Sequence, residues 1–151
     1  MENLTPSFDQ RMATFRQRCL ESGLAVTHQR TVIYEELAGS FHHPSPEMIY
    51  DRVKSKIPAI SLATVYKSIR TFAELGLLRE VNPFTESQRW DANLEPHHHL
   101  ICTACKSVTD IPASAIAPVE WQAPLPGDFR VQRLSVEVLG LCAACAAAAS
   151  H

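Results

Sequence analysis

The sequence has no hydrophobic run long enough to cross a membrane. The longest run, residues 139–149, has 11 residues, whereas a bilayer-spanning helix needs about 20. The first five residues include an acid and lack the apolar segment that begins a secretory leader. These absences argue against a membrane partner, and we expect a cytoplasmic protein.

The chain is also too short for a large enzyme barrel. Its 151 residues suffice for one ordinary domain or two small ones. Apolar residues are not scarce, because they make up 46% of the chain, and 20% of the residues are charged, as in folded soluble proteins. The composition therefore excludes a disordered chain and a coiled coil.

Positive charge is scarce overall, and the formal net charge is -2. Its distribution is uneven, because six basic residues between positions 52 and 79 stand against the single acid Glu74. These basic residues are Arg52, Lys54, Lys56, Lys67, Arg70 and Arg79. From position 92 onward, acids outnumber bases by five to three. The basic stretch is the segment best suited to contact phosphates, although a solvated helix face would have the same composition.

The first half of the chain has the pattern of capped helices. Apolar spacing predicts a first helix that ends at Gly23, a second from Thr27 to Gly39, a third from Ser45 to Pro58 and a fourth from Ser61 to near Gly76. The fourth helix has one apolar stripe, and its polar residues lie outside that stripe. It is a candidate for reading a DNA groove.

After this fourth helix the pattern changes to that of a hairpin. Residues 77–81 and 88–91 predict two strands, and residues 82–87 are rich in turn formers. Helices followed by a hairpin predict a winged helix-turn-helix module, in which the fourth helix recognises DNA and the hairpin is the wing. A helical domain with an unrelated small hairpin would give the same pattern. We expect a winged-helix domain over residues 1–91 and a hinge over residues 92–96.

The second half, residues 97–151, predicts a small α/β domain, so that the whole chain is of the α+β class. Residues 98–102 and 108–111 read as strands, and residues 134–138 alternate between apolar and polar side chains. Prolines between positions 112 and 128 leave room for at most a short covering helix around residues 113–121. A unit of about 55 residues is marginally stable without a covalent or metal staple.

Two CxxC pairs supply a candidate staple. Cys102 and Cys105 form the first pair, Cys142 and Cys145 form the second, and 36 residues separate them. Four thiolates complete the tetrahedral shell of a structural Zn²⁺ and leave no position for a substrate. A redox-active pair and disulfides are the alternatives, and disulfides are rare in a reducing compartment. Cys19 stands alone on an apolar helix face and is expected to be a core residue.

Histidines form two clusters, one at positions 42–43 and one at positions 97–99. In a strand, His97 and His99 point to the same side and can share a metal, whereas His98 points to the other side. Asp91 and Asp110 are nearby candidate carboxylate ligands. A second metal site and a surface loop with solvated histidines are both compatible with this pattern.

Several of these motifs together resemble those of the ferric uptake regulator family of bacterial metal- and peroxide-responsive transcription factors. The matching segments are Thr27-His28-Gln29-Arg30, His43-Pro44-Ser45-Pro46, Ser61-Leu62-Ala63-Thr64-Val65-Tyr66-Lys67, His97-His98-His99-Leu100-Ile101-Cys102 with Cys105, and Gly140-Leu141-Cys142 with Cys145. The resemblance runs from about Phe15 to Cys145. It implies a repressor that binds double-stranded operator DNA as a homodimer.

The resemblance also implies the site residues. The regulatory Fe²⁺ or Mn²⁺ would be held by five ligands, His43, Asp91, His97, His99 and Asp110. The structural Zn²⁺ would be held by the four paired cysteines. DNA contacts would come from the fourth helix through Ser61, Thr64, Tyr66, Lys67 and Arg70. Metal binding would lock the hinge and set the spacing of the two DNA-binding domains of a dimer.

Differences from the family pattern indicate the branch. Aspartate at position 110 resembles the peroxide-sensing branch, in which Fe(II)-catalysed oxidation would strike His43 and His97, whereas iron sensors usually have glutamate there. A further metal site found in some members is expected to be absent, because Leu134 and Ala117 occupy two of its positions. Lys106 stands where glycine is common. An iron-responsive repressor without peroxide sensing, or a zinc- or manganese-responsive member, is the alternative.

Two functions from other classes compete with a repressor. Two histidines and a carboxylate can bind catalytic iron or zinc in a hydrolytic or non-haem enzyme. That reading leaves the basic helix unexplained, and the sequence contains no nucleophile motif, so we do not expect an enzyme. A zinc-stapled module that binds proteins is the other alternative, and salt-sensitive binding to duplex DNA would distinguish it from a repressor.

Overall fold

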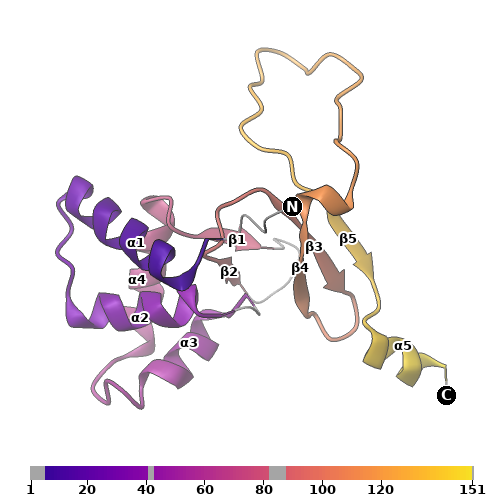
Figure 1. The fold of residues 1–151 in the computed structure, drawn as a ribbon. Helices are drawn as coiled ribbons and strands as arrows, with labels where there is room; N and C mark the ends of the chain where they lie inside the picture. Colours follow the sequence, from indigo (N-terminus) through magenta and orange to yellow (C-terminus); the bar gives the residue numbers. More distant parts are fainter. Residues whose placement is uncertain (1–5, 41–42, 82–87, 151) are drawn as a thin grey trace. The chain divides into compact units, whose positions relative to one another are not determined.

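The chain divides into two compact units, residues 1–95 and 96–151. The computed structural model in Figure 1 describes residues 6–40, 43–81 and 88–150. Helices dominate the first unit and a three-stranded sheet the second, as the α+β prediction requires. No helix in these described ranges is both long and apolar enough to span a bilayer.

The first unit begins with four helices, each capped by a serine or threonine. They are α1 (Phe8–Ser22), α2 (His28–Ala38), α3 (Pro46–Val53) and α4 (Leu62–Glu74). In each, the hydroxyl of the N-cap residue accepts a hydrogen bond from the backbone N–H three residues later. The caps predicted at Thr27, Ser45 and Ser61 are confirmed. The predicted length of α3 was wrong by about one turn, because the chain leaves the helix at Lys54 and Pro58 disfavours helical geometry at Ile57.

Three aromatic rings form the centre of the first unit. Phe15 stacks on Tyr34 with ring centroids 4.5 Å apart. Each of these rings forms a T-shaped contact with Phe72, with centroids 5.5 Å apart. These rings come from α1, α2 and α4, so they hold these three helices together. Burial raises the pKa of Tyr34 to about 12. Cys19 is fully buried beside them, which confirms its prediction as a core residue.

A two-stranded hairpin follows α4. Strands β1 (Arg79–Val81) and β2 (Arg89–Asp91) are antiparallel, with Arg79 opposite Asp91. The predicted turn, residues 82–87, lies outside the described residues. Gly76 turns the chain with a φ of 72°, and Leu77 and Leu78 enter the core instead of extending β1. The order of helices and hairpin is that of a winged helix-turn-helix.

The second unit is built on a sheet with strand order β4-β3-β5. Strand β3 (His97–Cys102) pairs antiparallel with β4 (Val108–Pro112) and parallel with β5 (Glu137–Gly140). Figure 1 shows the long connection between β4 and β5 as an extended loop. The third strand was predicted too early in the chain, over residues 134–138, because regular pairing with β3 begins at Glu137 and continues to Gly140.

One helix prediction in this unit needs correction, and one helix was not predicted. The expected covering helix around residues 113–121 is only a single 3-10 turn, η1 (Ala113–Ala115), since prolines 118, 124 and 126 interrupt helical hydrogen bonding. The alanine-rich tail, which carried no prediction, forms α5 (Ala143–Ala149), as the high helix propensity of alanine favours. Helix α5 has no buried residue, so it does not cover the sheet.

Candidate metal centres and nucleic-acid interface

The four paired cysteines converge at one end of the sheet. Cys102 ends β3, and its strand pairs with β5 so that Cys102 lies opposite Gly140, two residues before Cys142. Cys142 caps α5, and Cys145 lies in its first turn. The parallel pairing of β3 with β5 therefore brings the two CxxC segments together.

The distances between these sulfur atoms fit a tetrahedral Zn²⁺. All four Sγ atoms lie within 4.8 Å of one another, and those of Cys105 and Cys142 are 3.9 Å apart. A tetrahedron with Zn–S bonds of 2.3 Å has edges of about 3.8 Å. All five cysteines of the chain are free thiols. The cluster thus has the ligand set and geometry of a closed structural zinc site.

The backbone favours the ionised form of one thiol in this cluster. The N–H groups of Cys142 and Cys105 point at Cys102 Sγ from 3.4 and 3.5 Å. They lower the pKa of Cys102 to about 6, while hydrogen bonding from the neighbouring thiols raises the pKa of Cys145 to about 12. Thiolates packed this closely need a cation between them, which a bound Zn²⁺ supplies.

The backbone of Lys106, directly after Cys105, lies in the left-handed region. Its φ is 64°, and its N–H donates to Cys102 O at 2.9 Å. A residue with a Cβ is strained there, which explains why glycine suits this position.

We expect Lys106→Gly to stabilise the zinc-loaded second unit by about 1 kcal/mol, because it relieves left-handed strain. Thermal unfolding of the zinc-loaded protein measures this change. Lys106→Ala is the matched control, since it loses the same side-chain contacts but keeps the Cβ. An equal gain in both variants would show that the lysine chain, and not its backbone geometry, is the cause.

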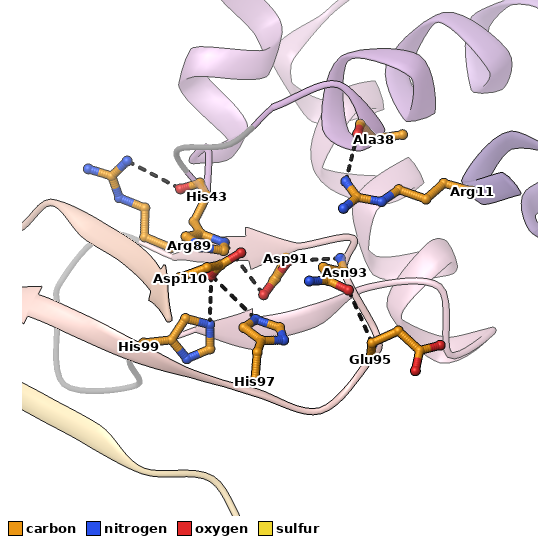
Figure 2. Close-up of polar contacts among 10 residues, drawn as sticks. All are labelled: Arg11, Ala38, His43, Arg89, Asp91, Asn93, Glu95, His97, His99 and Asp110. Atoms are coloured by element: carbon orange, nitrogen blue, oxygen red, sulfur yellow. Dashed lines mark hydrogen bonds and ion pairs between the residues drawn. The ribbon is translucent and has the colours of Figure 1, made fainter. Parts of the chain in front are cut away.

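In the first unit, His43 meets Asp91. The backbone N–H of Trp90 donates to Pro44 O at 3.2 Å, and the Arg89 guanidinium donates to His43 O at 3.3 Å. These bonds join the segment before α3 to β2, and Figure 2 draws the one from Arg89. They place Nδ1 of His43 3.6 Å from Oδ2 of Asp91. His43 has a φ of 48°, a conformation that is uncommon for a non-glycine residue.

One oxygen of Asp91 has a structural role and the other faces the histidine. Oδ1 accepts a hydrogen bond from the Asn93 backbone N–H at 2.8 Å, a local turn typical of aspartate. This bond fixes the carboxylate and directs Oδ2 to His43. The pair is buried and supplies one nitrogen and one oxygen of the kind that divalent iron or manganese binds.

In the second unit, His97 and His99 meet Asp110. His99 lies directly opposite Asp110 in the antiparallel β3–β4 pair. Nε2 of both histidines is 3.3 Å from Oδ1 of Asp110 (Figure 2). His98 faces elsewhere, because its Nδ1 accepts a hydrogen bond from Val136 N at 3.0 Å, as the strand alternation predicted. The unit thus presents two imidazoles and a carboxylate together.

The predicted DNA-contacting residues all lie on α4 or at its N-cap. Ser61 caps the helix, and its hydroxyl also contacts the Thr64 hydroxyl at 2.9 Å. Lys67 and Arg70 are exposed, whereas Tyr66 is half-buried. The Tyr66 hydroxyl donates a hydrogen bond to the Glu47 carboxylate on α3. Nothing in the sequence distinguishes Glu47 as part of this contact, because an acid in the first turn of a helix is typical of capping alone.

The basic stretch is less uniform than its charge count indicated. Lys56 Nζ lies 2.7 Å from Glu36 Oε1, and Lys54 Nζ lies 3.3 Å from Asp51 Oδ1. Both acids lie outside the stretch that was counted. Lys67 on α4 is therefore a better candidate for a phosphate contact than Lys54 or Lys56.

Comparisons with known proteins agree with this architecture. The model of the Ferric uptake regulator family matches residues 21–139. The peroxide-responsive repressor PerR of Staphylococcus epidermidis is 31% identical over 145 residues, which cover 96% of this chain and 94% of that protein. The structure of the Helicobacter pylori ferric uptake regulator Fur covers 97% of both chains with a TM-score of 0.71 and 18% identity.

A zinc uptake regulator in complex with zinc and DNA is also similar in fold, with a TM-score of 0.64 and 19% identity over 97% of this chain and 99% of that one. The family match spans the end of α1, the rest of the winged helix, the histidine strand and the first cysteine pair. This chain belongs to the ferric uptake regulator family of metal-responsive regulators.

Proposed function

We propose that this protein is a metal-dependent transcriptional repressor that binds operator DNA as a homodimer and responds to hydrogen peroxide. The observation that carries the proposal is that each unit places imidazole beside a carboxylate, with one ring, His43, at Asp91 and two rings, His97 and His99, at Asp110. The 31% identity to a peroxide-responsive repressor supports the choice of branch.

In this proposal the five side chains bind a single Fe²⁺ or Mn²⁺. Three imidazole nitrogens and two carboxylates form a mixed ligand set suited to either ion. The ligands come from both units, so their binding of one ion would restrain residues 92–96, which we propose act as the hinge. A restrained hinge would favour one spacing of the two recognition helices of a dimer.

Peroxide sensing would oxidise the metal ligands themselves. Fe²⁺, when bound, would catalyse the cleavage of peroxide, with the imidazole ring as the group that is oxidised, whereas Mn²⁺ does not do so readily. In the overall reaction an imidazole ring of His43 or His97 gains one oxygen atom and the peroxide leaves as water. The oxidised ring donates more weakly to a metal, so the hinge would be released and the affinity for DNA lost.

The experiment is a brief stoichiometric peroxide pulse on anaerobically Fe²⁺-loaded protein, followed by peptide mass spectrometry and an operator-binding assay. We expect the mass of one oxygen atom to be added to peptides that contain His43 or His97, together with release from DNA. The Mn²⁺-loaded protein is the control and should be unchanged. If the Fe²⁺ form stays unmodified and bound, an iron-responsive repressor without peroxide sensing is the better description.

DNA binding by α4 makes a prediction about salt. We expect Lys67→Ala to reduce the slope of log affinity against log salt concentration by about one, because one phosphate contact is lost. Lys56→Ala is the matched control and should leave the slope unchanged, since Glu36 already pairs with this lysine. Titrations of a fluorescent duplex at several salt concentrations measure both slopes. Equal slope changes would place the phosphate contacts outside α4.

Exposed apolar side chains support the homodimer. Leu100, Val138 and Leu141 lie on and beside β3 and β5 and are each 41–50% exposed. They border a shallow hollow near the cysteine cluster. An apolar surface of this kind is typical of a protein–protein contact, and we propose that a second copy of the chain covers it.

A further inference from the structure

Glu47 and Tyr66 link helices α3 and α4 of the winged helix. Glu47 lies in the first turn of α3 and is exposed, and Tyr66 lies on α4. The Tyr66 hydroxyl donates a hydrogen bond to the Glu47 carboxylate. Buried Ile49 and Val53 on α3, with Val65 and Ile69 on α4, pack in the core of the unit and fix the two helices on either side of this contact.

The carboxylate is well placed to remain charged. It lies near the positive N-terminal end of α3, which favours an anion. The hydrogen bond from Tyr66 further lowers the pKa of Glu47, and the same bond raises the pKa of Tyr66. A permanent negative charge beside a surface that approaches phosphates weakens binding to every DNA sequence alike. Its contact with a base-reading residue gives this charge a role.

We propose that Glu47 is a specificity-determining positioning residue, which occupies the Tyr66 hydroxyl and so leaves the ring of Tyr66 to contact bases. This inference rests on the proposed function, in which α4 binds DNA, and on the family resemblance, which implies that Tyr66 is one of the DNA contacts. A free tyrosine hydroxyl can donate to phosphates, which are the same in every sequence. A ring that contacts thymine methyl groups responds to the sequence. Glu47 therefore exchanges non-specific affinity for discrimination.

The test compares two duplexes with the full-length, Mn²⁺-loaded protein. One is the duplex that the wild type enriches from a random-sequence pool, and the other is a scrambled duplex of the same composition. We expect Glu47→Ala to bind the scrambled duplex more tightly and to lower the ratio of the two affinities about tenfold. Glu47→Gln should strengthen binding to both duplexes and keep the ratio, because its amide oxygen still accepts the hydrogen bond.

Asp51→Asn is the matched control for charge. Asp51 is an exposed acid on the same helix, and it pairs with Lys54 instead of a tyrosine. Its substitution should leave the ratio unchanged. A fall in the ratio as large as that of Glu47→Ala would show that the loss of any negative charge on α3 is enough to lower the ratio. That result would overturn the positioning role.

A double-mutant cycle tests the contact itself. Tyr66→Phe removes the hydroxyl that could donate to phosphates but keeps the ring, so we expect it to keep the ratio. In the Tyr66→Phe background, Glu47→Ala should no longer lower the ratio. An equal fall in both backgrounds would mean that the two residues act independently, and would overturn the proposal.

A measurement without DNA separates this inference from the proposed function. Alkaline absorbance titrations of the wild type and Tyr66→Phe isolate the ionisation of Tyr66, and Glu47→Ala should return its pKa toward the ordinary value. If the wild type prefers no duplex at all, the proposed function fails and this inference fails with it. If the wild type discriminates and Glu47→Ala discriminates equally well, only this inference is overturned.

Discussion

Replacing Cys105 by serine is expected to abolish zinc retention and dimerisation together. The second unit contributes no residue to the main hydrophobic core, whose members all lie between Met12 and Ala92. Its buried apolar side chains are Ile101, Cys102 and Val108, and one of these is itself a zinc ligand. A structural Zn²⁺ contributes about 10–16 kcal/mol to folding in small zinc domains, which is as large as the whole stability of an ordinary domain.

The serine variant keeps the shape of the side chain but offers no thiolate. Three sulfur ligands would remain, and the Cys105–Cys142 edge of the tetrahedron would be lost. Metal analysis after gel filtration gives the zinc content, and light scattering gives the oligomeric state. The thermal transition of the first unit should persist, because its aromatic core is built separately.

Cys19→Ala is the matched control for this experiment. Cys19 is fully buried in the first unit, so its truncation should lower stability by about 1 kcal/mol without affecting zinc. A Cys105→Ser protein with unchanged zinc content would contradict the assignment of the cluster as a structural site.

The elements that were correctly predicted are those with strong local signals. Hydroxyl caps at Thr27, Ser45 and Ser61 fix the starts of three helices, since each satisfies a backbone donor within three residues. The alternation of His97, His98 and His99 follows from strand geometry alone. The convergence of two CxxC pairs could be expected because four thiolates have few other stable arrangements.

The features that were missed depend on contacts between distant segments. The start of β5 is set by pairing with β3. The alternating residues 134–136 come before this start and have no regular strand pairing. The contact of Tyr66 with Glu47 joins residues 19 positions apart, and no spacing rule connects two different helices. The pairing of Lys56 with Glu36 likewise removes a positive charge that a count along the chain includes.

Asp110→Asn is expected to uncouple DNA binding from the regulatory metal. Both imidazoles of the second unit approach the same carboxylate oxygen, with Nε2 of His97 and of His99 each 3.3 Å from Oδ1. The amide has the same shape but no charge, so it would bind a divalent ion much more weakly and would also orient the two rings less well. We expect the affinity for Mn²⁺ to fall on the order of 100-fold.

The zinc content should not change in this variant, because the four cysteines form a group separate from His97, His99 and Asp110. Asp128→Asn, an exposed acid in the long connection to β5, is the matched control for the loss of one negative charge. Each protein is first freed of its regulatory metal while its structural zinc is kept. Titrating Mn²⁺ in the presence of a fluorescent duplex then gives the Mn²⁺ concentration at half-maximal DNA binding. That concentration should rise strongly for Asp110→Asn and stay constant for Asp128→Asn. If Asp110→Asn binds DNA at the wild-type Mn²⁺ concentration, Asp110 lies outside the regulatory site, and His97 and His99 must be assigned another role.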